Sequence, residues 1–443
     1  MKNWRWWAVL ATEFLGIGLI VLMTLQLFFA VRHEDIVASQ EIYEGLPIME
    51  ITLNGTTLDE IDNGSKSEKY TGNTLELSSQ NRIQKFENLQ ISGHGNSTWV
   101  QPKKPYDLKF EEKVDLLGIG KAKKWVLLAN YLDDTQIRND IAYYIGGMLG
   151  EEWEQNGEFV ELFVNGDYRG LYYLVQKVEI GKNLIDISDS LGVLVELENL
   201  YSVREVCYVT YDDECLTVKD LVDEGNLAQA MQDFLESFNK LKIAAEEGDY
   251  EKIEDLIDVE SFAKYYLVNE FTSNPDAYST SWYFYKDGSG DKIHSGVYWD
   301  YDLALSNTRW GGSKFFASDD NRTREKYVFG YKYYSNGEYL NAEIDTAISK
   351  LMYYLIKIPK FKKTVKNIFA EKMCGRGNEL LRFMERRTEK IVEAKARDLA
   401  RWDKGDASSE LEKLIEWVTK RYQHFEKEYG NNCIDHDINI VEI

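Results

Sequence analysis

The order of strand-like and helix-like segments is the feature that most restricts how this chain can fold. Strand-type patterns lie before about residue 218, and helical periodicity dominates from about residue 225 onward. This order predicts an α+β fold with two lobes, a β-rich lobe over 46–218 and a helical lobe over 219–430. The expected strands are 48–53, 88–92, 103–110, 125–130, 159–164, 168–175, 191–197, 282–285 and 297–301, and the expected helices are 135–149, 226–247, 259–272, 342–357, 378–402 and 408–428.

Two polar stretches have no predicted strand or helix of their own. Residues 59–82 are rich in turn formers and are expected to be surface loops. The basic run 360–366 is interpreted as a solvated face, and the alternative is a surface that holds an acidic acceptor segment.

Composition and charge narrow the class of protein. The 443 residues are 44% hydrophobic and 13% aromatic, which is enough to bury a large core. The formal net charge of −23 excludes nucleic acid and anionic lipid surfaces as main partners.

The N-terminal segment is the most apolar part of the chain. Residues 6–31 are interrupted by only two strongly polar side chains, Glu13 and Gln26, and are long enough to cross a bilayer as a helix. Lys2 and Arg5 precede this segment, which predicts a cytoplasmic N-terminus and a main domain outside the cell membrane. We therefore expect a single-pass anchor over 1–32, a linker over 33–45 and a tail over 431–443. The alternative is a cleaved signal peptide.

Three aspartates are the strongest candidates for chemistry. Asp276 precedes the predicted strand 282–285, and Asp300 and Asp302 follow it. A turn after that strand would bring the three carboxylates to one place, where they repel unless a cation lies among them. Oxygen ligands of this kind favour Mg²⁺ or Ca²⁺. The alternative is that Asp300 and Asp302 flank a buried tyrosine on an edge strand and face water.

A glycine turn and two lysines form a second candidate region. Gly95, Asn96 and Ser97 offer backbone amides and side-chain donors to an anion, and Lys103 or Lys104 could project toward it. The alternative is an ordinary glycine turn followed by solvated lysines.

The four cysteines contain no metal-type Cys-x-x-Cys pair. Cys207 and Cys215 flank a predicted hairpin and are expected either to form a disulfide or to remain two separately buried thiols.

Six motifs in order resemble the CotH family, the spore-coat protein H kinases. The resemblance extends over roughly residues 45–430. The motifs are Gly95-Asn96-Ser97-Thr98-Trp99, Lys103-Lys104-Pro105-Tyr106, Trp125-Val126-Leu127-Leu128 with Arg138-Asn139, Asn165-Gly166-Asp167-Tyr168-Arg169-Gly170-Leu171-Tyr172, Asn274-Pro275-Asp276 and Trp299-Asp300-Tyr301-Asp302.

The resemblance implies an atypical protein-kinase-like fold and transfer of the ATP γ-phosphoryl group to Ser or Thr of a coat or cell-surface protein. It implies ATP with Mg²⁺ or Mn²⁺ as cofactors. Site roles are carried over by matching positions. They are Asp276, Asp302 and Lys104 in catalysis; Asp276, Asp300, Asp302 and Asn307 at the metal; and Gly95, Asn96, Ser97, Lys103, Lys104 and Arg138 at the nucleotide.

Two departures keep a second class of function open. Gln176 stands where the family usually carries Glu, and Thr280-Ser281 stands where some members have Asn. The alternative function is a catalytically weak or inactive kinase-like protein that binds a partner or assembles a coat. A third hypothesis, a glycosidase that uses paired carboxylates, is less favoured because the aromatic residues are spread as core aromatics would be.

Overall fold

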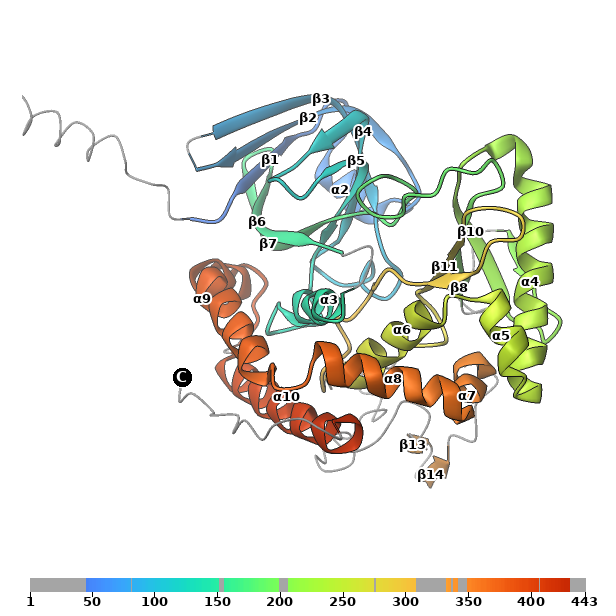
Figure 1. The fold of residues 1–443 in the computed structure, drawn as a ribbon. Helices are drawn as coiled ribbons and strands as arrows, with labels where there is room; N and C mark the ends of the chain where they lie inside the picture. Colours follow the sequence, from blue (N-terminus) through green and yellow to red (C-terminus); the bar gives the residue numbers. More distant parts are fainter. Residues whose placement is uncertain are drawn as a thin grey trace, which may run out of the picture.

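The first half of the described chain closes into a β-barrel (Figure 1). The computed structural model describes residues 45–80, 82–150, 155–198, 206–274, 276–307, 332–335, 338–341, 349–405 and 407–430. The barrel order is β1-β2-β3-β4-β5-β7-β6, and it closes through parallel pairing of β1 with β6. Its strands are β1 (Ile48–Thr52), β2 (Tyr70–Ser79), β3 (Arg82–Gly93), β4 (Tyr106–Asp115), β5 (Lys121–Leu128), β6 (Gly157–Val164) and β7 (Asp167–Gln176).

The polar stretch 59–82 is not a set of loops, so that prediction was wrong. It contains nearly all of α2 (Leu58–Asn63), which begins with a capping box between Thr57 and Glu60, and the whole of β2. Leu75 and Leu77 of β2 are buried in the barrel interior. The alternation is short and its outward positions are polar, which explains why the strand was missed.

A second, five-stranded sheet lies beside the barrel in the order β12-β11-β8-β10-β9. The helices α4 (Leu227–Glu247) and α5 (Tyr250–Leu256) lie at its outer side, after the short 3-10 helix η1 (Glu224–Asn226) (Figure 1). The disulfide between Cys207 and Cys215 joins β9 to β10 and confirms the first of the two expectations for these cysteines. The strands are β8 (Val193–Glu198), β9 (Cys207–Val209), β10 (Cys215–Leu221), β11 (Trp282–Lys286) and β12 (His294–Ser295).

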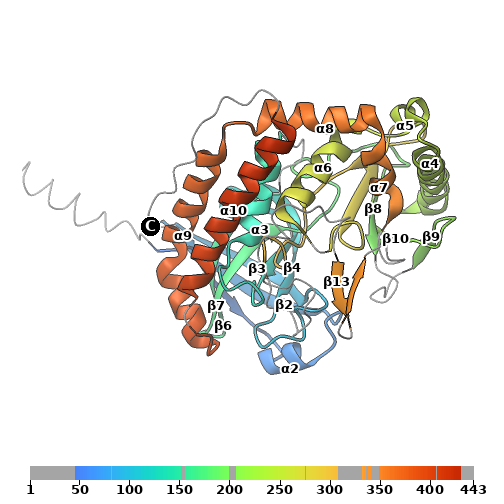
Figure 2. The same ribbon diagram turned by 90° about the horizontal axis from the view of Figure 1, so that it is seen from below.

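Helices form the rest of the described chain (Figure 2). The central one is α6, because all its residues from Ser261 to Thr272 are buried. It contacts α8, α3 and α10, and the view from below shows α10 between α6 and α9. The helices are α3 (Arg138–Met148), α6 (Val259–Thr272), α7 (Lys350–Lys357), α8 (Pro359–Lys372), α9 (Gly377–Arg401) and α10 (Ser408–Tyr429), and a small hairpin comprises β13 (Lys332–Ser335) and β14 (Glu338–Asn341).

The helix α9 ties the helical part to the barrel. Asp398 of α9 accepts a hydrogen bond from the backbone amide of Leu171 in β7 at 2.9 Å. Gly170 permits this approach, because a Cβ there would lie 2.1 Å from the Asp398 carboxylate. Arg397 of α9 adds an ion pair with Glu161 of β6 at 2.9 Å.

The structure confirms the predicted α+β class and corrects several elements. Residues 297–301 form no strand, since Val297 and Asp300 have positive φ angles of 62° and 68°. The helix α8 occupies the basic run 360–366, and Pro359 at its first turn suits a helix start. No helix among the described residues is long and apolar enough to cross a membrane, and the predicted span 6–31 lies outside those residues.

Candidate functional site

The end of α6 positions the first of the three aspartates. Asn274 follows α6 and donates its side-chain amide to the Asn269 side chain at 3.2 Å and to the Asp300 carbonyl at 3.5 Å. The Asn274 side chain in turn accepts from the backbone amide of Asp276 at 3.2 Å. Asp276 is thereby fixed in a turn next to the segment that carries the other two acids.

Asp300 and Asp302 lie on an irregular segment that α3 and α6 hold in place. The Asn139 side chain of α3 accepts from the backbone amide of Tyr301 at 2.8 Å, and the Thr272 carbonyl of α6 accepts from that of Leu305 at 2.7 Å. The positive φ of Asp300 is a strained conformation, and such strain concentrates at functional sites.

The three carboxyl groups lie close enough to alter one another's ionisation. Burial, and after it the charge of Asp300, raises the pKa of Asp276 to about 7. Burial is also the first cause that raises the pKa of Asp302 well above its usual range, followed by Asp300, Asp276 and Asp133. The carboxyl groups of Asp300 and Asp302 hydrogen-bond each other. The convergence predicted from the sequence is therefore present in the fold.

The glycine turn lies against this acid cluster through His94. The His94 ring packs edge-on to Trp299 with centroids 5.9 Å apart, and its charge opposes the burial that raises the pKa of Asp300. Gly95 has a φ of 74°, and a Cβ there would lie 2.1 Å from the Thr98 hydroxyl. Only glycine fits this turn without strain.

A charged group on β4 supports His94. Asp107 accepts from His94 Nδ1 at 3.0 Å and from Lys177 Nζ at 2.7 Å. Burial alone would raise the pKa of Asp107, but His94 and Lys177 lower it to about 2. Lys177 follows β7 directly, and Asp107 links its ammonium to His94.

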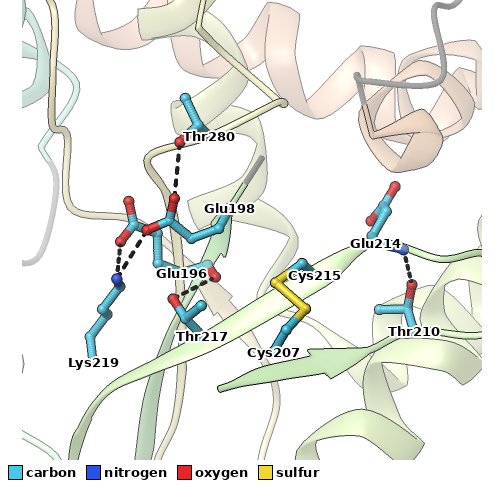
Figure 3. Close-up of a disulfide and its surroundings, with 9 residues drawn as sticks. All are labelled: Glu196, Glu198, Cys207, Thr210, Glu214, Cys215, Thr217, Lys219 and Thr280. Atoms are coloured by element: carbon cyan, nitrogen blue, oxygen red, sulfur yellow. Dashed lines mark hydrogen bonds and ion pairs between the residues drawn. A yellow bond between two sulfur atoms is a disulfide. The ribbon is translucent and has the colours of Figure 1, made fainter. Parts of the chain in front are cut away.

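A further carboxylate borders the cluster from the second sheet (Figure 3). Glu198 at the end of β8 pairs with Lys219 at 3.0 Å and accepts from the Thr280 hydroxyl at 3.5 Å. Its charge contributes to the raised pKa of Asp300. Glu196 pairs with the same Lys219 at 2.9 Å, and its pKa rises to about 8 mainly because it is buried.

The two lysines proposed for the nucleotide have partners elsewhere. Lys103 is fully buried and pairs with Asp398 of α9 at 2.6 Å. Lys104 donates to the Trp99 carbonyl at 2.6 Å and lies over the Trp99 ring. None of these contacts belongs to the acid cluster, so the structure does not bring either ammonium to the three aspartates.

Arg138 and Asn307, which were also predicted as site residues, contact residues of the acid cluster or residues next to it. Arg138 is buried in an ion pair with Asp133 and donates to the Thr135 hydroxyl at 3.1 Å. The Asn307 side-chain amide donates to the carbonyl of Asp302 at 2.6 Å.

The predicted residues Gly95 and Asn96 of the glycine turn are both contacted by Lys66. The Lys66 ammonium donates a hydrogen bond to the Gly95 carbonyl at 2.6 Å and another to the Asn96 side chain.

His94, Asp107, Lys177 and Glu198 were not predicted as site residues. Part of the signal was available, because His94 lies inside the glycine turn and Lys177 directly follows Gln176. What the sequence did not reveal is that Asp107 of β4 joins His94, which follows β3, to Lys177, which follows β7, and that His94 and Glu198 both act on Asp300.

The donor set suits a hard divalent cation. The buried Asp302 and the half-buried Asp276 and Asp300 have raised pKa values, which is the situation that a bound cation relieves. Within the described part of the chain, no group of three or more His, Cys, Asp or Glu side chains is placed so that it could hold a metal ion. The fit therefore rests on the chemistry of the carboxylates and not on a preformed coordination shell.

A barrel, a set of helices and a buried acid cluster where they meet define a class of α+β proteins with a polar site between two structural halves. The family model described as CotH kinase protein matches residues 91–425, so the chain belongs to the CotH kinase family. No curated protein matches the chain.

Proposed function

We propose that this protein is a membrane-anchored atypical protein kinase that transfers the ATP γ-phosphoryl group to Ser or Thr of a cell-surface or coat protein. The observation that carries the proposal is the clustering of the buried Asp302 with the half-buried Asp276 and Asp300, whose carboxyl groups raise one another's pKa beside the glycine turn. Membership of the CotH kinase family supports the same class of reaction.

The proposed roles follow from the positions of the side chains. Asp300 and Asp302 would bind Mg²⁺ or Mn²⁺, which when bound neutralises charge on the ATP phosphates. Asp276 has a pKa of about 7 and would accept the proton of the acceptor hydroxyl near neutral pH. The charge of His94 acts on Asp300, and Lys177 shares Asp107 with His94, so we assign these two side chains to the phosphates in place of Lys103 and Lys104.

The proposed location outside the cytoplasm has independent support. Cys207 and Cys215 form a disulfide, and Cys374 is also disulfide-bonded. Structural disulfides are typical of oxidising compartments. The apolar segment 6–31 would supply the anchor.

One observation favours a second candidate, a kinase-like binding protein with weak or no activity. Gln176 replaces the usual Glu, and its side-chain nitrogen is buried without a hydrogen-bond partner among the residues that the structure describes. The usual Glu could pair with a lysine through its negative charge, and the neutral Gln176 cannot. We favour the kinase because the acid cluster retains all three aspartates.

Incubation of the full chain with labelled ATP, a divalent cation and an acidic protein tests the proposal. We expect label on Ser or Thr, at a rate that rises between pH 6 and pH 8. The sign follows because Asp276 must be ionised to accept a proton and its pKa is about 7. Absence of transfer with Mg²⁺ and with Mn²⁺ over this pH range would favour the binding protein instead.

A further inference from the structure

Four lysines line a cavity of about 420 Å³ between the barrel and the end of β10. Lys109 and Lys113 come from β4, and Lys123 and Lys124 come from β5. The opposite wall is formed by the segment after β7 and by β10. A cavity with this lining is unexpected in a chain whose net charge is −23.

The acids of the cavity do not neutralise the lysines. Glu179 pairs with Lys124 at 3.3 Å, and Asp220 accepts from the backbone amide of Ile180 at 2.9 Å. In the part of the chain that the structure describes, Lys109, Lys113 and Lys123 take part in no ion pair. The lining carries two more positive than negative charges, and an anion would relieve the repulsion among them.

The cavity opens on the same strands as the functional site. Lys109 lies two residues after Asp107 on β4, so both side chains point to the same side of the strand, about 7 Å apart. Lys124 is the pairing partner of Lys109, and its carbonyl accepts from the Lys177 amide at 3.0 Å. Asp107 and Lys177 therefore connect the cavity to His94 and the acid cluster.

The charge of the cavity distinguishes between possible ligands. If the nucleotide phosphates bind at the acid cluster, only the uncharged base and ribose extend away from it, and these have no need of four lysines. An acceptor segment can place anionic side chains there while its hydroxyl stays near Asp276.

We propose that the lysine cavity is a subsite for anionic side chains of the acceptor protein, on the same strands that lead through Asp107 and Lys177 to His94. The anions are carboxylates or phosphomonoesters already present on the acceptor. This inference rests on the proposed kinase function, because it assumes an acceptor hydroxyl at Asp276.

Binding of fluorescent peptides to the full chain, without ATP, tests the subsite. Each peptide has one serine and, four residues away, a block of three Glu, three phosphoserines or three Ala. We expect both anionic peptides to bind at least about tenfold more tightly than the alanine peptide, and the tighter of the two identifies the anion. Equal affinities for all three peptides would overturn the proposal.

A charge-reversal variant with a matched control locates the binding. Lys109→Glu with Lys113→Glu changes two exposed lysines of the cavity, and Lys362→Glu with Lys363→Glu makes the same charge change on exposed positions of α8. We expect the first variant to lose about tenfold in affinity for the anionic peptides and the second to stay within about twofold. Equal losses, or weakened ATP binding with unchanged peptide binding, would contradict the subsite.

The two proposals fail in different ways. If anionic peptides bind but no label is transferred, the proposed kinase function is contradicted and the cavity is supported as an anion-binding site. If label is transferred at equal rates to all three peptides, the kinase function is supported and the proposed subsite is contradicted.

Discussion

Asp302→Asn is expected to lower label transfer by about 10³-fold or more, because the change removes a buried charge that would bind the metal and oppose charge on the phosphates. The fold should tolerate it. Burial and the neighbouring aspartates raise the pKa of Asp302, so the folded state loses stability as pH rises and this carboxyl ionises. In a buffer at pH 8 that contains a chelator to remove divalent cations, Asp302→Asn should therefore be more stable than the wild type.

Transfer rates and urea unfolding of the same preparations measure both effects. Asp291→Asn is the matched control, since Asp291 is exposed in the turn between β11 and β12 and should affect neither quantity. Loss of activity together with a gain in stability is the pattern of a residue kept for function. Transfer within about threefold of the wild type would exclude Asp302 from the metal site.

Lys103→Met is expected to lower the free energy of unfolding by about 3–5 kcal/mol, because it leaves the Asp398 carboxylate buried without its cation. The matched control is Lys104→Met at the neighbouring, partly exposed lysine, with an expected loss of about 1 kcal/mol or less. Urea unfolding of both variants and of Lys103→Met with Asp398→Asn measures the coupling between the two groups.

The same experiment separates two roles for Lys103. If its ammonium serves the fold, adding Asp398→Asn should recover part of the lost stability, since the unpaired charge is removed. If Lys103→Met leaves the stability unchanged and weakens the affinity for ATP, Lys103 belongs to the nucleotide site, as the sequence predicted.

The sequence was most informative where function is carried by consecutive residues. The Asn274 to Asp276 and Trp299 to Asp302 motifs predicted that their acids meet, and the fold brings them together. The family assignment is confirmed by the CotH family model, which matches residues 91–425.

Side-chain direction was the property that the sequence could not supply. Lys103 and Lys104 stand next to each other before a strand, and nothing local indicates that Asp398, almost 300 residues later, buries the first of them. His94 follows β3 and Lys177 follows β7, and they became site residues only when the barrel order β3-β4-β5-β7 brought both to Asp107 of β4.

Secondary structure was mispredicted where apolar patterning was short or misleading. Residues 297–301 alternate like a strand, but the backbone turns at Val297 and Asp300 to bring the acids to α6. The basic run 360–366 is helical because Phe361 and Val365 lie on one buried face, four residues apart.

The central claim is that the clustered aspartates Asp276, Asp300 and Asp302 at the meeting point of barrel and helices bind a divalent cation and, with it, ATP. The most direct measurement is calorimetric titration of ATP into the full chain at pH 8, with Mg²⁺ and with EDTA. We expect binding in Mg²⁺ and an affinity at least about tenfold lower in EDTA. Equal affinities in the two solutions, or no binding in either, would contradict the claim.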